Sequence, residues 1–380
     1  MSFLFITGMP RSGTTLLDKL LSAHPQALIL SQPLPLFYVE LKRAFLASRG
    51  MTVFPDEKAF PMGDMIGHQY YQAGDFLRFL KEVPVEPVFF NRIVADMADY
   101  SGQYTKFVNS FHMPSDAAPT YFFELVDGYL RKISGVPASS FFGCKETFCE
   151  EFIPLFLDQG ALVVMMIRDP RDVITSLNYG RGGVYGGRKK PHLFNIRCWR
   201  KSAAFVLEYK DHPRFNFLLY ETLVKKPQDT MRDIAAFLNL DMLPPQVFTH
   251  ELKDQNGNIW ESNSSHEADA RIFQSSVGKY RVHLQPREAA FIEACCYPEM
   301  RALGYETSLD PDAAVDCMKD YADTLKLERP ELCGYTWSQT ALAQETDRLE
   351  NARQGVYKPE LFIFKKAFDE IMKALFSNTE

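Results

Sequence analysis

The stretch FLFITGMPRSGTTLLDKLLSAHP, from Phe3 to Pro25, decides the fold. It opens with the apolar run FLFIT, which is typical of a buried parallel strand. Gly8 and Gly13 then stand five residues apart, as in the glycine-rich loops that cradle phosphate. A helix should follow, because leucines recur on one face, and Pro25 ends it. The order of strand, glycine loop and helix predicts a phosphate-binding loop (P-loop).

This loop departs from the pattern of nucleotide triphosphatases at one position. The Walker A pattern G-x-x-x-x-G-K-[ST] wants a lysine where Thr14 stands. In ATP and GTP enzymes that lysine reaches the β- and γ-phosphates beside a magnesium ion. Here Arg11 offers a charged fork to an oxyanion, while Ser12, Thr14 and Thr15 add hydroxyl groups. The loop therefore favours a phosphate or sulfate donor that needs no metal; the alternative is a glycine turn that merely joins strand to helix.

The composition limits the class of protein. The chain has 380 residues, of which 46% are hydrophobic and 24% charged, so we expect a packed core. A net charge of -6 argues against nucleic-acid binding by electrostatics alone. We expect neither a membrane span nor a secretory signal, since the first strand starts at Phe3. The seven cysteines form no metal-ligand pattern and predict reduced thiols in a cytoplasmic protein.

Further apolar runs at 139–144, 161–167 and 215–220 predict strands, and 227–240 predicts an amphipathic helix. Alternating strands and helices predict an α/β protein, a three-layer α/β/α fold around a central, mostly parallel sheet. Residues 33–120 lack this alternation and predict a helical cap. Its aromatic side chains either pack internally or line an acceptor pocket. They are Phe37, Tyr38, Tyr70, Tyr71, Phe89 and Phe90.

The chain divides into a main domain over 1–305, which includes the cap, and a helical extension over 306–380. Apolar residues in the extension recur every three or four positions and predict one buried stripe. They are Leu361, Phe364, Phe368, Ile371 and Leu375. This stripe should dock against the parent domain, and a homodimer contact is the alternative.

Several helix ends carry capping residues. Thr147 and Glu150 fit a capping box that would start a helix after the second predicted strand. Asp169 and Pro170 suit the N-cap and first position of the next helix. His24, at the end of the first helix, is expected to cap that terminus.

A second anion site is predicted after the strand 161–167. Arg168 follows this strand directly, and Ser176 lies about two turns into the next helix, so both could approach one phosphate. The alternative is that Arg168 and Asp169 form a surface ion pair. Together with the P-loop, the pair of Arg168 and Ser176 indicates a ligand with two anionic ends.

The motifs PRSGTTLL and RDPRDVITSL, in this order, resemble the sulfotransferases that use 3'-phosphoadenosine 5'-phosphosulfate (PAPS). Among these, the chain is most similar to the tyrosylprotein-sulfotransferase-like branch with many bacterial members, over about residues 3–285. The resemblance implies metal-independent transfer of a sulfuryl group from PAPS to a hydroxyl. The acceptor would be a small molecule, lipid or carbohydrate, and the product would be 3',5'-ADP (PAP).

The resemblance also implies roles for matched positions. Arg11 and Lys145 would act on the transferring group. The positions expected to bind PAPS are Pro10, Arg11, Ser12, Gly13, Thr14, Thr15, Arg168, Ser176, Tyr220, Lys279 and Tyr280. Ser264 or Ser265 falls at roughly the spacing of a family serine near the sulfuryl group. Lys145 and Tyr220 could instead be structural residues at strand ends.

The chain differs from the family pattern at the general base. Gln32 stands near the position of the family's glutamate and cannot accept a proton. Candidates for the base are His266 and His112, with Glu40 and His68 as further options.

Two other functions stay open. One is a P-loop kinase or NTPase in which Asp169 ligates magnesium; the other is a non-catalytic protein that binds PAPS or PAP.

Overall fold

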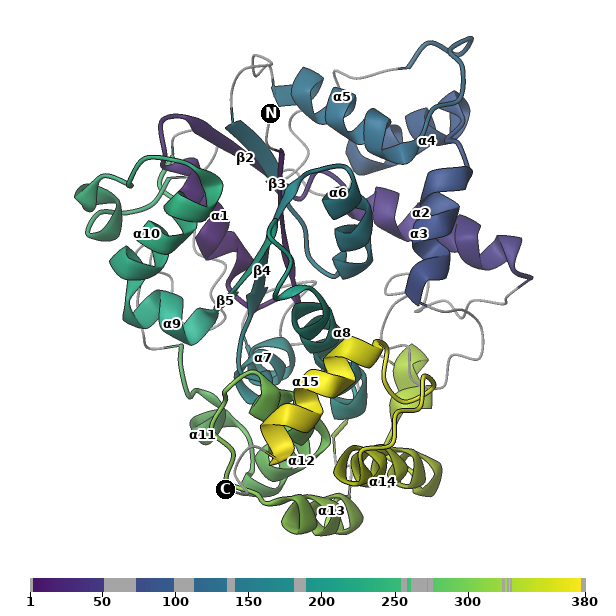
Figure 1. Ribbon diagram of the computed structural model, residues 1–380, viewed down its shortest axis with the longest axis vertical. Helices are drawn as coiled ribbons and strands as arrows, with labels where there is room; N and C mark the ends of the chain where they lie inside the picture. Colours follow the sequence, from purple (N-terminus) through teal and green to yellow (C-terminus); the bar gives the residue numbers. More distant parts are fainter. Residues whose placement is uncertain are drawn as a thin grey trace.

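Figure 1 shows the computed structural model, which has a five-stranded sheet at its centre. The structure describes residues 3–50, 73–98, 113–134, 141–180, 189–253, 258–260, 272, 276–322, 325–326, 328 and 330–376. The strands are β1 (Phe3–Gly8), β2 (Ala27–Ser31), β3 (Phe141–Lys145), β4 (Leu162–Ile167) and β5 (Phe215–Leu219). Their order is β2-β3-β1-β4-β5, and every neighbouring pair is parallel. The predicted α/β class is confirmed, although β2 was not among the predicted strands.

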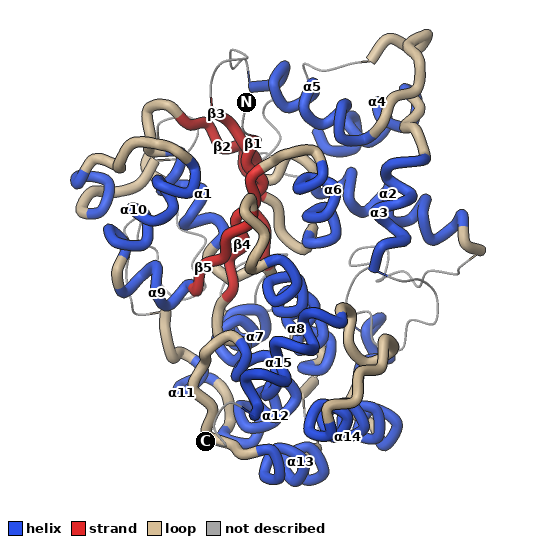
Figure 2. The backbone as a smooth tube through the Cα atoms, in the orientation of Figure 1, coloured by secondary structure: helices blue, strands red, loops and turns tan. Residues whose placement is uncertain are grey.

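Helices cover both faces of the sheet, as Figure 2 shows. One face packs against α1 (Thr14–Ser22), α9 (Tyr220–Lys225) and α10 (Pro227–Leu238). The other packs against α6 (Ile153–Asp158) and α8 (His192–Tyr209). Successive β1 residues alternate between these layers: Leu4 and Ile6 join the core beneath α1, and Phe3 and Phe5 join the core beneath α6. The expected three layers are therefore present.

The carboxyl ends of the strands meet at one edge of the sheet. Ile6 of β1 is in register with Lys145 of β3, and Gly8 is in register with Met166 of β4. The turns after β1, β3, β4 and β5 are consequently neighbours. In open parallel sheets this edge is where ligands bind.

The described part of the predicted cap is helical. It consists of α2 (Pro35–Ser48), α3 (Ala73–Glu82), α4 (Pro87–Ala98) and, just beyond the predicted limit, α5 (Phe122–Ser134). Phe37 lies 4.9 Å from Phe90 between ring centroids, and Tyr38 lies 5.1 Å from Phe152. Phe37, Tyr38 and Phe90 are buried, and Phe89 packs against the same cluster. These aromatics pack in the protein interior, while Tyr70 and Tyr71 lie outside the described residues.

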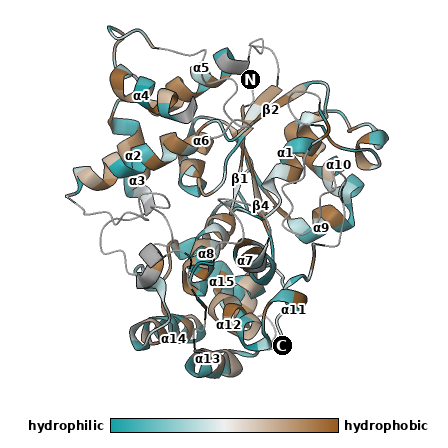
Figure 3. Cartoon of the chain, turned by 180° about the vertical axis from the view of Figure 1, so that it is seen from behind, coloured by the Kyte–Doolittle hydropathy of each residue, from teal (hydrophilic) through white to brown (hydrophobic). Residues whose placement is uncertain are grey.

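The C-terminal part is helical and packs against the main layers. It contains α11 (Tyr280–His283), α12 (Pro286–Ala302), α13 (Pro311–Asp320), α14 (Gln339–Gln354) and α15 (Lys365–Phe376). Phe368 and Ile371 are buried, and the Phe364 ring lies 5.0 Å from Phe205 of α8. The predicted docking of this stripe on the parent domain is confirmed. Figure 3 shows that α14 is largely hydrophilic.

The remaining described elements are short. A 3-10 helix η2 (Glu150–Phe152) precedes α6, η3 (Pro245–Phe248) follows α10, η4 (Pro330–Tyr335) precedes α14, and α7 (Pro170–Tyr179) follows β4. Within the described ranges, no helix is long and apolar enough to cross a bilayer.

Two predicted caps are wrong. The helix after β3 begins at Glu150 without a side-chain cap. The Glu150 carboxylate instead accepts a hydrogen bond from Ser202 and lies 3.2 Å from the Lys201 ammonium. The His24 ring accepts from the backbone N–H of Gln26, at 3.1 Å, rather than bonding the end of α1. In both cases the side chain binds a partner outside the helix instead of capping it.

Candidate active site

The predicted P-loop, between β1 and α1, has an unusual backbone. Arg11 has a φ of 73° and Gly13 a φ of 92°, both in the left-handed region. A Cβ at Gly13 would lie 2.4 Å from the Tyr220 ring, and one at Gly8 would lie 2.3 Å from the Met166 carbonyl oxygen. Glycine is required at both positions because the loop packs directly on the neighbouring strand ends.

The loop concentrates hydrogen-bond donors at the N-terminus of α1. Thr14 and Thr15 open this helix, and its first turn holds no acidic residue, so the helix dipole favours an anion there. Ser12 is fully buried, and within the described part of the chain its hydroxyl has no hydrogen-bond partner. A buried polar group without a partner is costly, and an oxyanion bound in the loop would satisfy it.

The second predicted anion site adjoins the P-loop. Arg168 follows β4, and Ser176 lies in the second turn of α7. The Arg11 side chain donates from Nε to the Ser176 hydroxyl at 2.9 Å. Arg168 donates from Nη1 to the backbone oxygen of Arg11 at 3.0 Å. The structure thus brings Arg11, Arg168 and Ser176 together from motifs more than 150 residues apart.

Arg168 joins four segments of the chain. Its guanidinium lies over the Tyr220 ring, 4.6 Å from the centroid, and its Nη2 donates to the backbone oxygen of Ser276. The indole N–H of Trp199 donates to the Arg168 backbone oxygen at 2.7 Å. Arg168 is 6% exposed, so its charge acts in a largely dehydrated site where an anion would be strongly attracted.

Asp169 is fully engaged by protein groups. Its carboxylate caps α7 by accepting from Arg171 N at 2.9 Å, as predicted, and also accepts from the Arg171 side chain at 2.7 and 3.0 Å. The alternative of an Arg168–Asp169 surface pair is wrong, because Asp169 pairs with Arg171 and both are buried. These contacts leave Asp169 poorly suited to ligate magnesium, which disfavours the kinase alternative.

Asp172 holds the turn at residues 276–280, called the late turn below, against α7. Its carboxylate accepts from the backbone N–H of Gly278 at 2.7 Å and of Tyr280 at 2.9 Å. Burial raises the pKa of Asp172, while the Arg168 charge opposes that shift. The turn containing Lys279 and Tyr280 is therefore fixed beside α7, close to the second predicted anion site.

Lys145 lies at the end of β3, next to the P-loop strand, and is fully buried. Its ammonium donates to the Gln32 side-chain oxygen at 3.3 Å, and the Gln32 amide donates to Thr147 at 3.4 Å. Burial lowers the Lys145 pKa to about 8, although the Asp18 and Glu146 carboxylates favour the charged form. The ammonium is therefore poorly solvated.

The candidate bases are placed differently. His266, His112 and His68 lie outside the described residues, as do Ser264 and Ser265. Glu40 lies on α2, where it pairs with Arg43 and, at 3.2 Å, with Arg92. This carboxylate belongs to an ion-pair cluster of the cap.

Residues that the sequence did not single out support the site. Glu221 accepts from Asp169 N at 2.9 Å and from the Tyr305 hydroxyl at 3.3 Å, and burial raises its pKa to about 7. Glu293 accepts from Arg171 at 2.6 Å. The adjacency of Glu221 to Tyr220 was the only local signal for either.

Comparison with protein-family models gives two matches. A model described as "Sulfotransferase family" matches residues 4–63, and one described as "Sulfotransferase domain" matches residues 146–304. The first range contains the P-loop and the second contains Arg168, Ser176 and the late turn. Together they cover more than half of the chain. No curated protein matches.

The solved structures that this chain matches have low sequence identity and TM-scores below 0.5. A sulfotransferase domain from the curacin biosynthetic pathway is 18% identical, with 80% of this chain and 98% of that chain covered and a TM-score of 0.44. Mouse sulfotransferase SULT7A1 complexed with PAP is 13% identical, with 79% of this chain and 84% of that chain covered and a TM-score of 0.41. Retinol dehydratase in a complex with retinol and PAP is 14% identical, with 81% of this chain and 83% of that chain covered and a TM-score of 0.37. Conclusions about function therefore depend on the family matches and on this chain's own residues.

Proposed function

Because the chain belongs to the sulfotransferase family, we propose that the sulfuryl group it transfers comes from PAPS. The proposed acceptor is a hydroxyl of a small molecule, lipid or carbohydrate, and the product is 3',5'-ADP. The observation that carries the proposal is the direct contact between Arg11 and the pair Arg168 and Ser176. PAPS has an anionic group at each end of one nucleoside, so it needs two neighbouring anion sites.

The P-loop would hold the 5' end of the donor. Arg11, the buried Ser12 hydroxyl and the amide groups at the start of α1 supply donors there. In the proposed reaction, an acceptor oxygen attacks sulfur in line and the 5'-phosphate leaves. These donors are fixed by the left-handed backbone at Arg11 and Gly13, so they can meet charge on the leaving oxygen without reorganisation.

The second site would bind the 3'-phosphate. Arg168 and the Ser176 hydroxyl already lie in one hydrogen-bonded group with Arg11. A phosphate between them would take over these donors, and Tyr220 would keep the Arg168 guanidinium in its plane. We propose that Lys279 and Tyr280 flank the nucleotide from the late turn, because Asp172 holds that turn beside α7.

Lys145 would stabilise the sulfuryl group during transfer. It stands at the carboxyl edge beside β1, where Gln32 accepts a hydrogen bond from its buried ammonium. Gln32 has no basic atom, so we propose His266 or His112 as the group that accepts the acceptor's proton. We also propose that the protein acts in the cytoplasm, since it has free thiols at Cys144, Cys149, Cys198, Cys295, Cys296 and Cys317.

The test is to incubate the protein with PAPS and a metabolite extract in the presence of EDTA. Mass spectrometry should find products heavier by one sulfuryl unit, formed together with 3',5'-ADP. Tight binding of 3',5'-ADP without any product would indicate the non-catalytic alternative. ATP turnover that EDTA abolishes would indicate the NTPase alternative.

A further inference from the structure

We propose that Arg171 is a positioning residue for the second anion site. Glu293 of α12 holds Arg171 in place, and the start of the C-terminal extension in turn holds Glu293. This inference rests on the proposed function, because it concerns the site assigned to the 3'-phosphate. It also gives the start of the extension, residues 306–309, a part in nucleotide binding.

Arg171 controls the start of α7 through Asp169. It binds both oxygens of that carboxylate, with Nε 3.0 Å from Oδ1 and Nη2 2.7 Å from Oδ2. The same carboxylate caps α7. Arg168 directly precedes Asp169, so the orientation of the Arg168 side chain depends on the position of the Asp169 cap, which Arg171 fixes.

Arg171 also supports the late turn. The Tyr280 ring lies under its guanidinium, with the centroid 4.5 Å away. Arg171 therefore contacts two sides of the site, the cap of α7 and the segment that Asp172 fixes. A displaced guanidinium would loosen both sides at once.

Glu293 of α12 fixes the guanidinium from the other side. Its carboxylate accepts from Arg171 Nη1 at 2.6 Å and is 2% exposed. The same carboxylate accepts from the backbone N–H groups of Ser308 at 2.5 Å and Leu309 at 2.8 Å. Arg171 Nη2 also donates to the Glu306 backbone oxygen at 3.2 Å.

Charge balance makes the arrangement cooperative. One guanidinium lies between two carboxylates, Asp169 and Glu293, and all three side chains are largely buried. Neutralising Glu293 removes one of these carboxylate charges and weakens the acceptor for residues 308 and 309. Arg171 is then held mainly by Asp169. The C-terminal extension no longer restrains the position of the Asp169 cap.

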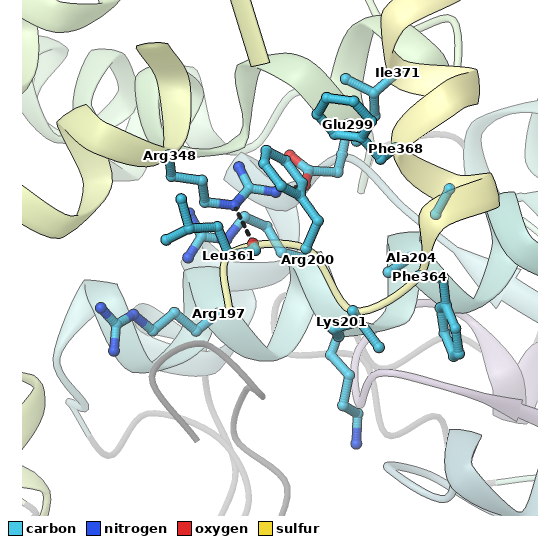
Figure 4. Close-up of a pocket in the computed structure, with 13 residues that line it drawn as sticks. Arg197, Arg200, Lys201, Ala204, Glu299, Arg348, Leu361, Phe364, Phe368 and Ile371 are labelled. Atoms are coloured by element: carbon cyan, nitrogen blue, oxygen red, sulfur yellow. Dashed lines mark hydrogen bonds and ion pairs between the residues drawn. The ribbon is translucent and has the colours of Figure 1, made fainter. Parts of the chain in front are cut away.

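The chain offers a matched control on the same helix. Glu299 of α12 is also buried and pairs with an arginine of the extension, Arg348 of α14. Figure 4 shows this pair in the pocket between α8 and the C-terminal helices, with Arg348 also donating to the Leu361 backbone oxygen at 3.2 Å. It resembles the Arg171–Glu293 pair in chemistry but involves α14 rather than α7.

The experiment compares Glu293→Gln with Glu299→Gln in the full-length protein by calorimetry. The ligands are 3',5'-ADP and 5'-AMP, at a temperature where both variants are folded. Glu293→Gln should weaken 3',5'-ADP about tenfold and 5'-AMP less than about threefold, since only the 3' site is displaced. Glu299→Gln should change both affinities less than about twofold while lowering the melting temperature.

Equal losses for the two nucleotides, no loss, or the same selective loss in Glu299→Gln would overturn the inference. If Glu293→Gln does not fold, Arg171→Lys takes its place, because lysine keeps the charge and lacks the fork. The same selective loss is expected there, and unchanged binding of 3',5'-ADP would overturn the inference. Wild-type protein that binds neither nucleotide would instead refute the proposed function.

Discussion

The two proposed anion sites are built in different ways. The P-loop depends on backbone conformation: Gly8 and Gly13 allow close packing, and Ser12 is buried without a hydrogen-bond partner in the described part of the chain. The second site depends on side chains held from elsewhere, with Trp199 on Arg168 and Glu221 on Asp169.

This difference predicts different responses to mutation. Changes in the P-loop should act directly, because a shifted backbone removes several donors together. Changes around the second site should be graded, because each supporting contact is one of several. The predictions below test that contrast, beginning with the largest expected effect.

Gly13→Ala should abolish most activity. The added Cβ would meet the Tyr220 ring at 2.4 Å in a left-handed conformation, so the loop must move. We expect the transfer rate to fall about 1,000-fold, measured with saturating PAPS. Gly50→Ala is the control, since Gly50 has a φ of 70° and open space around its Cβ position. A similar loss in both variants would mean that conformational strain, and not the packing of the P-loop, explains the effect.

Lys145→Met should lower the rate of single-turnover transfer about 100-fold, because one charge opposite the transferring group is lost. PAPS affinity should change less than about fivefold, since the P-loop and second site remain. Lys42→Met is the control: Lys42 is also fully buried with a pKa lowered to about 8, yet it pairs with Glu151 beneath the cap. An unchanged rate in Lys145→Met would remove the catalytic role.

The pH dependence should report the same lysine. Burial lowers the folded-state pKa of Lys145 from 10.5 to about 8, so the required ammonium is present below about pH 8 and lost above it. The single-turnover rate should fall about fivefold between pH 8 and pH 9. In Lys145→Arg the fall should disappear from this range, because a guanidinium keeps its proton. A wild-type rate that is flat to pH 9 would argue against a charged Lys145 in catalysis.

Tyr220→Phe should have the smallest effect. The ring under Arg168 stays, and only the hydroxyl bond to Ser276 is lost. We expect about a threefold weaker affinity for 3',5'-ADP by calorimetry. Tyr220→Ala also removes the ring and should cost about tenfold or more. Equal effects in the two variants would show that the ring does not support Arg168.

The sequence predicted features whose determinants are local. The spacing of Gly8 and Gly13, and the N-cap Asp169 before Pro170, need no information from distant residues. The capping box at Thr147 and Glu150 failed because Lys201 and Ser202, about 50 residues away, bind the glutamate more favourably. β2 was not predicted because its apolar run, residues 27–30, is only four residues long; in the structure it is stabilised by pairing with β3.

The supports of the second site could not be predicted for the same reason. Glu293 reaches Arg171 across 122 residues, and Asp172 reaches Gly278 across 106. A carboxylate on an amphipathic helix looks like any solvated charge until the fold places an arginine beside it. The acceptor site is harder still, because the candidate bases His266 and His112 lie outside the described residues.

The central claim is that the two anion sites bind the two ends of one nucleotide. Calorimetry with 3',5'-ADP and 5'-AMP on wild-type protein and Arg168→Ala, in EDTA, tests it most directly. Wild-type protein should bind 3',5'-ADP about 100-fold more tightly than 5'-AMP, and Arg168→Ala should reduce that preference to less than about fivefold. Equal affinities of wild-type protein for the two nucleotides, or an unchanged preference in Arg168→Ala, would contradict the account.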